Sequence, residues 1–365
     1  MTKLGVLFSV LGVGAGCIPA FAQKQLPNII VMLSDDQGWG DLGFTGNTFV
    51  QTPNIDRIAH EGTILENFYV CPVSSPTRAE FLTGRYHVRS GVNSTTGGGE
   101  RFNLGEKTIA EYFREAGYAT SLFGKWHSGT QYPYHPNARG FEEFYGFCSG
   151  HWGNYWNPVL EHNGEIISGE GFIIDDLTDK ALDYIRDHKE HPFFMFLSYN
   201  TPHSPMQVPD SWWNRVKDRT LSQRATFPEQ EDTTFTKAAL ALAENLDWNI
   251  GRVLSLLHSL DLEQETIVIY FSDNGPNSFR WNGGMKGRKG STDEGGVRSP
   301  FCIRWPGHIR KGAVETQLSG AIDLIPTLLG LAGIEYTPLR KLDGIDWGQR
   351  LLDEKAPAID RVLYS

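Results

Sequence analysis

The chain has 365 residues, of which 40% are hydrophobic and 21% are charged. This composition is ordinary for a globular protein and excludes a disordered chain or a coiled coil. The length fits one large α/β unit with a smaller attachment, or two domains. Because 43 acidic residues outnumber 33 Lys and Arg, the net charge is −10 and no nucleic-acid partner is expected. An anionic substrate would need cationic side chains gathered locally.

The first residues have the pattern of an export signal. Lys3 gives a short basic start, an apolar run follows, and Ala20-Phe21-Ala22 is a small-x-small cleavage site. We therefore predict a signal peptide over residues 1–22 and a periplasmic or secreted protein. Lipid anchoring at Cys17 is the alternative, because the preceding Gly-Ala-Gly completes an imperfect lipoprotein box. No other run is long and apolar enough to span a membrane.

The apolar pattern predicts strands and helices that alternate along the chain. First in chain order come a strand at Ile29–Leu33, a helix from Thr52-Pro53 to His60, a helix at Thr108–Ala116 and a strand at Ala119–Phe123. Then follow a helix at Asp175–His188, a strand at Phe193–Leu197, a helix at Thr236–Leu260, a strand at Ile267–Phe271 and a helix at Ala321–Leu331. Thr52 is the expected N-cap of its helix. The alternation predicts a mostly parallel sheet with helices on both faces.

Polar residues follow each of the four expected strands. In chain order these are Asp35-Asp36, Lys125 with His127, His203, and Asp273-Asn274. Ligands of open α/β sheets bind beyond the carboxyl ends of the strands. We therefore expect these side chains to meet at one edge of the sheet.

Four of these residues offer oxygen ligands: Asp35, Asp36, Asp273 and Asn274. Ca²⁺ and Mg²⁺ prefer oxygen, whereas zinc favours His or Cys. Adjacent carboxylates also repel each other unless a cation lies between them. The alternative is capping of helices or turns, which Asp and Asn do well. Two such pairs at strand ends of one sheet favour a site for Ca²⁺, with Mg²⁺ as the second choice.

The cationic candidates are Arg78, Lys125, His127, His203 and Lys289. Taken singly, each is explained equally well as a solvated surface lysine or a hydrogen-bonded core histidine. Their places in glycine- and proline-rich turns beside strand ends favour a ligand site. Together with a metal ion they would clamp a tetrahedral oxyanion.

Ser74 is the candidate nucleophile. It precedes an expected helix start at Pro76, so its side chain would lie at the positive end of a helix dipole. The alternative is a plain N-cap serine. An unmodified serine would also need a general base or a metal to activate it.

The segment Ser74-x-Pro76-x-Arg78 with Leu82-Thr83-Gly84-Arg85 resembles the signature of the formylglycine-dependent sulfatases, within the alkaline phosphatase superfamily. Further blocks match in family order: Asp35-Asp36-Gln37-Gly38-Trp39-Gly40, Gly124-Lys125-Trp126-His127, Thr201-Pro202-His203, Ser272-Asp273-Asn274-Gly275, Lys289-Gly290 and Glu294-Gly295-Gly296-Val297-Arg298. The resemblance implies an alkaline phosphatase-like α/β fold and hydrolysis of a sulfate monoester. It also implies that a maturation enzyme oxidises Ser74 to formylglycine.

By the same resemblance, the Ca²⁺ ligands are Asp35, Asp36, Asp273, Asn274 and the modified Ser74. Arg78 would orient the hydrated aldehyde, and Lys125 and Lys289 would bind the sulfate oxygens. His127 would assist release of sulfate. His203, with Lys289, would protonate the leaving alcohol. Thr77 stands where the family often has Ser, which keeps the hydroxyl.

The resemblance also bears on the domains. We expect a catalytic α/β domain over residues 23–360, and residues 361–365 as the start of a smaller C-terminal antiparallel sheet that is truncated or missing. Val362–Tyr364 is the expected first strand of that sheet. The three cysteines left after cleavage are expected to be buried thiols with at most one disulfide: Cys71, Cys148 and Cys302.

The substrate is the least determined part of the prediction. The export signal and the serine-type motif favour a sulfated carbohydrate over an aryl or steroid sulfate. Possible sugar contacts are His151-Trp152-Gly153-Asn154-Tyr155-Trp156, Trp212-Trp213, His87 and Arg89, although aromatic residues are also ordinary packing residues. The alternatives are a phosphoester or phosphonate hydrolase of the same superfamily, and a silent protein that binds sulfated glycans. Ser74 as an engineered replacement of Cys is a further alternative.

Overall fold

The computed structural model of the chain describes residues 1–2 and 26–364. The predicted signal peptide, residues 1–22, and its alternative anchor Cys17 therefore lie outside the described residues, apart from Met1 and Thr2. In the described ranges no helix has both the length and the apolar character needed to cross a bilayer.

The predicted sheet is present and has ten strands. In spatial order they are β11 (Ala313–Glu315), β2 (Thr63–Leu65), β10 (Phe301–Arg304), β9 (Thr266–Ser272), β1 (Asn28–Ser34), β8 (Phe193–Ser198), β4 (Ala119–Lys125), β5 (Glu143–Phe147), β6 (Val159–His162) and β7 (Glu165–Ser168). The five strands from β9 to β5 are all parallel, and antiparallel β10 and β6 flank them. All four strands predicted from the sequence belong to this parallel centre. A separate pair joins β3 (Phe68–Tyr69) to β12 (Ser319–Gly320).

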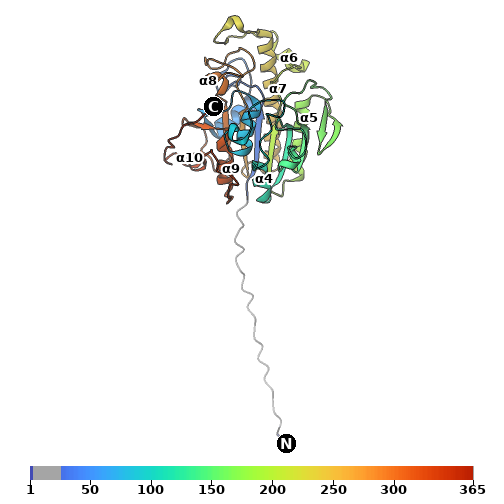
Figure 1. Cartoon of the computed structure of the whole chain (residues 1–365), viewed down its shortest axis with the longest axis vertical. Coiled ribbons are helices and arrows are strands. Elements are labelled where there is room, and N and C mark those ends of the chain that lie inside the picture. Colours follow the sequence, from blue (N-terminus) through green and yellow to red (C-terminus); the bar gives the residue numbers. More distant parts are fainter. Residues whose placement is uncertain (3–25, 365) are drawn as a thin grey trace.

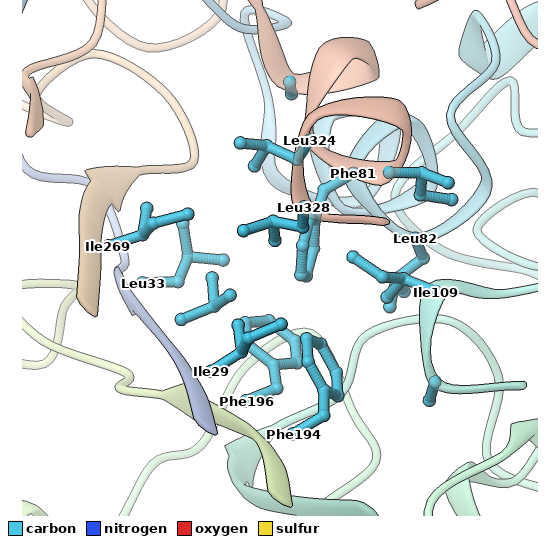
Figure 2. Packing of buried hydrophobic residues seen from close by; sticks show 14 of the residues in the cluster. Ile29, Leu33, Phe81, Leu82, Ile109, Phe194, Phe196, Ile269, Leu324 and Leu328 are labelled. Carbon is cyan, nitrogen blue, oxygen red and sulfur yellow. The ribbon is translucent and has the colours of Figure 1, made fainter. Parts of the chain in front are cut away.

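Both faces of the central sheet are buried, which explains why its strands are continuously apolar. Successive side chains of a strand point to opposite faces, so Ile29, Val31 and Leu33 pack into one hydrophobic cluster. Ile30 and Met32 pack into the other. Figure 2 shows the first cluster, with Ile29 and Leu33 facing side chains of the covering helices.

Three helices cover that face: α2 (Ser74–Thr83), α4 (Ile109–Glu115) and α9 (Leu324–Ala332). The opposite face is covered by α1 (Pro53–Glu61), α5 (Ile173–Asp187) and α7 (Thr233–Ser259). In Figure 1, α5 lies on one side of the molecule, and α9 lies on the other with α10 (Gly348–Leu352). Shorter helices are α3 (His87–Ser90), α6 (Asp210–Val216) and α8 (Glu294–Val297). The predicted α/β architecture is therefore confirmed.

One local prediction is confirmed in part and another is wrong. Thr52 is the N-cap residue of α1, as predicted. Within residues 26–364 its side chain makes no cap hydrogen bond, because its Oγ1 donates to Asp56 Oδ1 (3.0 Å) and accepts from Gly43 N (2.8 Å). Val362–Tyr364 forms no strand in the described chain. A strand needs a neighbour to satisfy its backbone groups, and this segment is instead held by an ion pair from Arg361 to Asp323 (2.6 Å).

The three cysteines are buried free thiols, as predicted, in the described part of the chain. The predicted helix at Ala321–Leu331 is divided, with a 3₁₀ turn at Ala321–Asp323 before α9. The other predicted helices agree with the structure to within a few residues.

Candidate active site

Neighbouring parallel strands bring the four oxygen ligands together. Asp35 and Asp36 follow β1, Asp273 and Asn274 follow β9, and the last residues of the two strands, Ser34 and Ser272, are in register. The two acidic pairs therefore leave the sheet side by side, and the Asp36 N–H donates to Asp273 Oδ1 at 3.2 Å. All four side chains are buried.

The oxygens of this group fit a hard cation. Asp36 Oδ1 accepts from Asn274 Nδ2 at 2.8 Å. Asp35 Oδ1 and Asn274 Oδ1, although buried, have no hydrogen-bond partner among the residues that the structure describes. A buried acceptor without a partner is costly, and an oxygen-preferring divalent ion would satisfy both atoms. The donor set therefore suits Ca²⁺ or Mg²⁺.

The Asp36 backbone is held in an unusual conformation. Its φ is 64°, in the left-handed region that a residue other than glycine adopts at a cost of about 1 to 3 kcal/mol. Arg280 Nη2 donates to the Asp36 carbonyl oxygen at 3.0 Å and forms a buried ion pair with Asp41 at 2.6 Å. The sequence reasoning missed this Arg280–Asp41 support, because nothing local connects two residues so far apart in the chain.

Ser74 is the first residue of α2, which begins two residues before the predicted start at Pro76, and three groups converge on its hydroxyl. Its Oγ donates to Asp273 Oδ2 at 2.5 Å, accepts from Arg78 Nε at 2.8 Å, and lies 3.2 Å from His127 Nδ1. One turn of helix separates Ser74 from Arg78, which places both side chains on one face. Thr77, which stands where the family often has Ser, uses its hydroxyl oxygen to accept a hydrogen bond from the Cys71 N–H at 2.8 Å.

Arg78 is fully buried and all three nitrogens of its guanidinium donate hydrogen bonds. Nη2 pairs with Asp273 at 3.0 Å, while Nη1 donates to Ser198 Oγ at 2.6 Å and to the Lys125 carbonyl oxygen at 3.2 Å. Ser198, the last residue of β8, was not among the sequence candidates. Its place at the carboxyl end of a predicted strand was the signal that could have identified it.

The two lysines and His203 lie against the acidic pair of β1. Lys125 Nζ is 2.7 Å from Asp35 Oδ2, and Lys289 Nζ is 2.6 Å from Asp36 Oδ1. His203 Nε2 lies 3.4 Å from Asp36 Oδ2. Burial, the largest single influence, would raise the pKa of Asp35. The charges of Lys125, His203, Arg78 and Lys289 together outweigh burial and hold that pKa well below its usual range. Burial likewise opposes the charge on Lys289, yet Asp36 and Asp35 raise its pKa.

His127 faces Ser74 with a fixed ring. Its Nε2 lies 2.9 Å from the Thr95 carbonyl oxygen, so this nitrogen carries a hydrogen and Nδ1 is left toward Ser74. Burial, with the nearby charge of Lys125, holds the pKa of His127 well below its usual range. The ring needs Gly150, because a Cβ there would lie 2.1 Å from Nε2.

Of the remaining sequence candidates, the structure places some at the site and others in packing contacts away from it. Exposed His151 lies at the site, with its ring 5.2 Å from that of His203. Trp152 is used in packing, stacked on Phe147. Others packed against neighbouring side chains are Trp156, Trp212, Trp213, His87 and Arg89, the last of which pairs with Asp343. His87 and Arg89 follow the far end of α2, about 15 Å of helix away from Ser74.

The arrangement gathers oxygen ligands, two lysines and one hydroxyl at the carboxyl edge of a parallel sheet, where a tetrahedral anion with several negative oxygens can be held. Fold and site together define a hydrolase of the alkaline phosphatase superfamily. The match is more specific than that, because residues 27–334 fit the family described as Sulfatase. The chain belongs to the sulfatase family and is a sulfuric ester hydrolase.

Individual relatives agree with this assignment. Mouse N-acetylgalactosamine-6-sulfatase is 31% identical over 398 residues, which cover 99% of this chain and 72% of that protein. Ps i-CgsB in complex with k-i-k-neocarrahexaose has a TM-score of 0.79 at 32% identity, covering 88% of this chain and 75% of that one. A Bacteroides thetaiotaomicron protein of glycosaminoglycan metabolism has a TM-score of 0.80 at 26% identity, covering 92% and 78%.

Proposed function

We propose that this sulfatase hydrolyses O-sulfate monoesters of carbohydrates, using formylglycine derived from Ser74 beside a Ca²⁺ ion. The observation that carries the proposal is the convergence of Asp273, Arg78 and His127 on the Ser74 hydroxyl. When present, formylglycine supplies a hydrated aldehyde as the nucleophile and Ca²⁺ supplies Lewis acidity. The ligands for the ion are Asp35, Asp36, Asp273, Asn274 and the modified Ser74.

The cationic side chains bind and orient the sulfate. Lys125 and Lys289 lie on the two sides of the acidic pair, where each Nζ can reach the oxygens of a bound sulfate. Negative charge grows on the leaving oxygen as the ester bond breaks, and fixed cations in a water-poor site stabilise that charge. Arg78 cannot move, because its guanidinium is tied to Asp273 and Ser198, so it fixes the position of the group at residue 74.

The two histidines have different proton tasks. His127 Nδ1 faces position 74, and the lowered pKa of His127 keeps the ring neutral, so that this nitrogen can accept a proton from a hydroxyl there. His203 Nδ1 lies 2.6 Å from the Ser204 carbonyl oxygen, so this nitrogen carries a hydrogen and fixes the ring. Nε2 of His203 lies 3.4 Å from Asp36 Oδ2, and when the ring is protonated this nitrogen would give a proton to the leaving alcohol.

A carbohydrate substrate is supported by the relatives, which include an N-acetylgalactosamine-6-sulfatase and a structure with a bound carrageenan hexasaccharide. The export signal read from the sequence supports a protein that meets extracellular or periplasmic glycans. The family match to sulfatases favours sulfate monoesters over the phosphoester alternative.

Mass spectrometry of the tryptic peptide Ile58–Arg78 from the native host tests the modification. We expect a mass lighter by two hydrogens, with the change located at Ser74. The same preparation is then incubated with sulfated oligosaccharides, and released sulfate is measured by ion chromatography. An unmodified Ser74 in a preparation that still releases sulfate would contradict the formylglycine proposal, and modified protein that cleaves aryl sulfates alone would contradict the carbohydrate assignment.

A further inference from the structure

A basic hollow opens beside the candidate active site. It has a volume of about 350 Å³ and is lined, among others, by Phe227, Phe279, Lys286, Arg288, Lys289 and Asp293, which we call the basic pocket. Lys289 belongs to both places, because its Nζ contacts Asp36 while its side chain also lines the pocket. A group bound in the pocket would therefore lie next to the sulfate held by Lys289.

The loop that forms the basic pocket is fixed to the catalytic segment. The Lys289 N–H donates to the Pro276 carbonyl oxygen at 2.9 Å. The Gly290 N–H donates at 2.8 Å to the carbonyl oxygen of Pro72, which lies two residues before Ser74. The Gly295 N–H closes the loop on the Lys286 carbonyl oxygen at 2.7 Å. These bonds keep the pocket and Ser74 in a constant relative position, which a subsite for one connected substrate requires.

The charge of the basic pocket is opposite to that of the whole protein. Three cations line it against one carboxylate, Asp293, in a chain of net charge −10. Asp293 is paired with Lys286 at 3.2 Å. Arg288 makes no ion pair with any carboxylate of the described residues. Its Nη1 donates to the Asn277 carbonyl oxygen at 3.5 Å, and its guanidinium lies 4.9 Å from the centre of the Phe279 ring. A guanidinium without a carboxylate partner is available to an anion.

The walls of the basic pocket also suit a sugar. Phe227 and Phe279 meet edge to face with their ring centroids 6.5 Å apart, and Phe227 is 38% exposed although it is a large apolar residue. Apolar ring faces beside a few charged groups are the usual composition of small-molecule sites, and the volume is within their range. A purely hydrophobic ligand would not use the cations of the pocket, and a bare inorganic ion would not use its aromatic rings.

We propose that the basic pocket binds a second anionic group of the substrate, a sulfate ester or a carboxylate on a sugar linked to the one that is desulfated. Lys286 and Arg288 hold the anion, and Phe227 and Phe279 contact the ring that bears it. The preferred substrate is then a polyanionic oligosaccharide and not a sulfated monosaccharide. This inference rests on the proposed carbohydrate sulfatase activity.

The test uses the K286A/R288A double variant of the full, mature enzyme. Hydrolysis of 4-nitrocatechol sulfate reports the catalytic centre alone, because the only sulfate ester of this small substrate is the one that is hydrolysed. Inhibition of that reaction by glucose 6-sulfate, a carrageenan oligosaccharide and a chondroitin 6-sulfate tetrasaccharide reports the pocket. The carrageenan probe carries only sulfates and the chondroitin probe also carries carboxylates, so the two distinguish the anions.

We expect at least one oligosaccharide to inhibit the unaltered enzyme about tenfold more strongly than glucose 6-sulfate, as one charge-assisted contact gives. In K286A/R288A that advantage should disappear, while kcat/KM for 4-nitrocatechol sulfate stays within about twofold. The matched control is R186A/K189A. It removes two exposed cations, Arg186 in α5 and Lys189 just after that helix, and should leave all inhibition constants unchanged.

Two results would overturn the inference: equal inhibition by mono- and oligosaccharides, or an oligosaccharide advantage that survives in K286A/R288A. Failure of the proposed function has a different signature. In that case the enzyme hydrolyses 4-nitrocatechol sulfate but releases sulfate from none of the glycans, whatever residues occupy positions 286 and 288.

Discussion

Two hollows in this protein differ in volume and in the charge of their linings. The basic pocket measures about 350 Å³, whereas a second hollow of about 790 Å³ lies against β4 to β7 and α5. Its lining carries one lysine, Lys180, against five carboxylates: Glu142, Glu143, Glu170, Asp183 and Asp187. We call this second hollow the acidic cavity. The larger space repels the anionic substrate that the smaller one attracts.

The position in the sheet explains the difference. Ala119, which lines the acidic cavity, begins β4, whereas Lys125 ends that strand and contacts Asp35. Lys125 thus lies at the carboxyl end of β4, whereas the acidic cavity lies along the strand from Ala119 to Phe123. At the carboxyl end, loops of four adjacent parallel strands converge, while the acidic cavity lies toward the amino end of β4. Volume alone is therefore a poor guide to function in this fold, and strand direction with local charge is a good one.

The largest effect expected from this comparison is that of Ser74→Ala. Removing the hydroxyl on which Asp273, Arg78 and His127 converge should lower kcat by about 10⁴-fold or more. The matched control is Ser168→Ala in the acidic cavity, which should be fully active. Release of sulfate measures activity, and circular dichroism with thermal melting checks that both variants are folded. Normal turnover by Ser74→Ala would show that the nucleophile lies elsewhere.

Removal of the metal should have the next largest effect. A bound divalent ion contributes several kcal/mol of charge stabilisation, so chelation should lower kcat by about 10³-fold. Adding Ca²⁺ should restore activity and raise the melting temperature, since an ion that binds only the folded state stabilises it. Metal content is measured on the same samples. Full activity in protein shown to hold no metal would rule out the role given to Asp35 and Asn274.

Lys289→Ala tests the lysine shared by the active site and the basic pocket. Loss of one fixed cation from the sulfate site should lower kcat/KM for a small aryl sulfate by about 10²-fold. Lys180→Ala removes the same charge from the acidic cavity and should change kcat/KM by less than about twofold. If both variants lost activity equally, net charge and not position would control the reaction.

The smallest effect is expected from neutralising the acidic cavity itself. Glu143 is partly exposed and paired with His162 at 2.7 Å, so Glu143→Gln should alter stability by about 1 kcal/mol or less. Its kcat/KM should stay within about twofold of the unaltered value at physiological salt. Glu143 is in register with Ser121, four residues or about 13 Å along the sheet from Lys125, and screening weakens a charge at that distance. Steady-state kinetics and a urea melt check both values. A large kinetic change would give the acidic cavity a part in catalysis.

Much of the fold and the site could be read directly from local sequence. Apolar runs such as Ile29–Leu33 and Ile267–Phe271 are buried on both faces wherever they lie in a helix-covered sheet, so their composition alone predicts them. The polar pairs that follow them had to meet once the strands were parallel and adjacent. Ser74 with Arg78 depends only on one turn of helix, which the sequence spacing already contains.

Other features depended on contacts between distant segments. Support of the Asp36 backbone by Arg280, the place of Ser198 beside Arg78, and the room that Gly150 leaves for His127 each join residues with no local pattern between them. The predicted strand at Val362–Tyr364 failed for the same reason, because a strand exists only where a second strand pairs with it. The basic pocket likewise needed Phe227 and Phe279 to come together.

The sequence by itself determined the family, the order of the elements and the residues that carry the chemistry, because each of these is written in local spacing and residue type. The tertiary structure decided which of those residues touch, which oxygens are left without a partner, and where cations and aromatic rings form a pocket. Hydrogen bonding and burial depend on distances of a few ångströms in space and do not depend on separation along the chain.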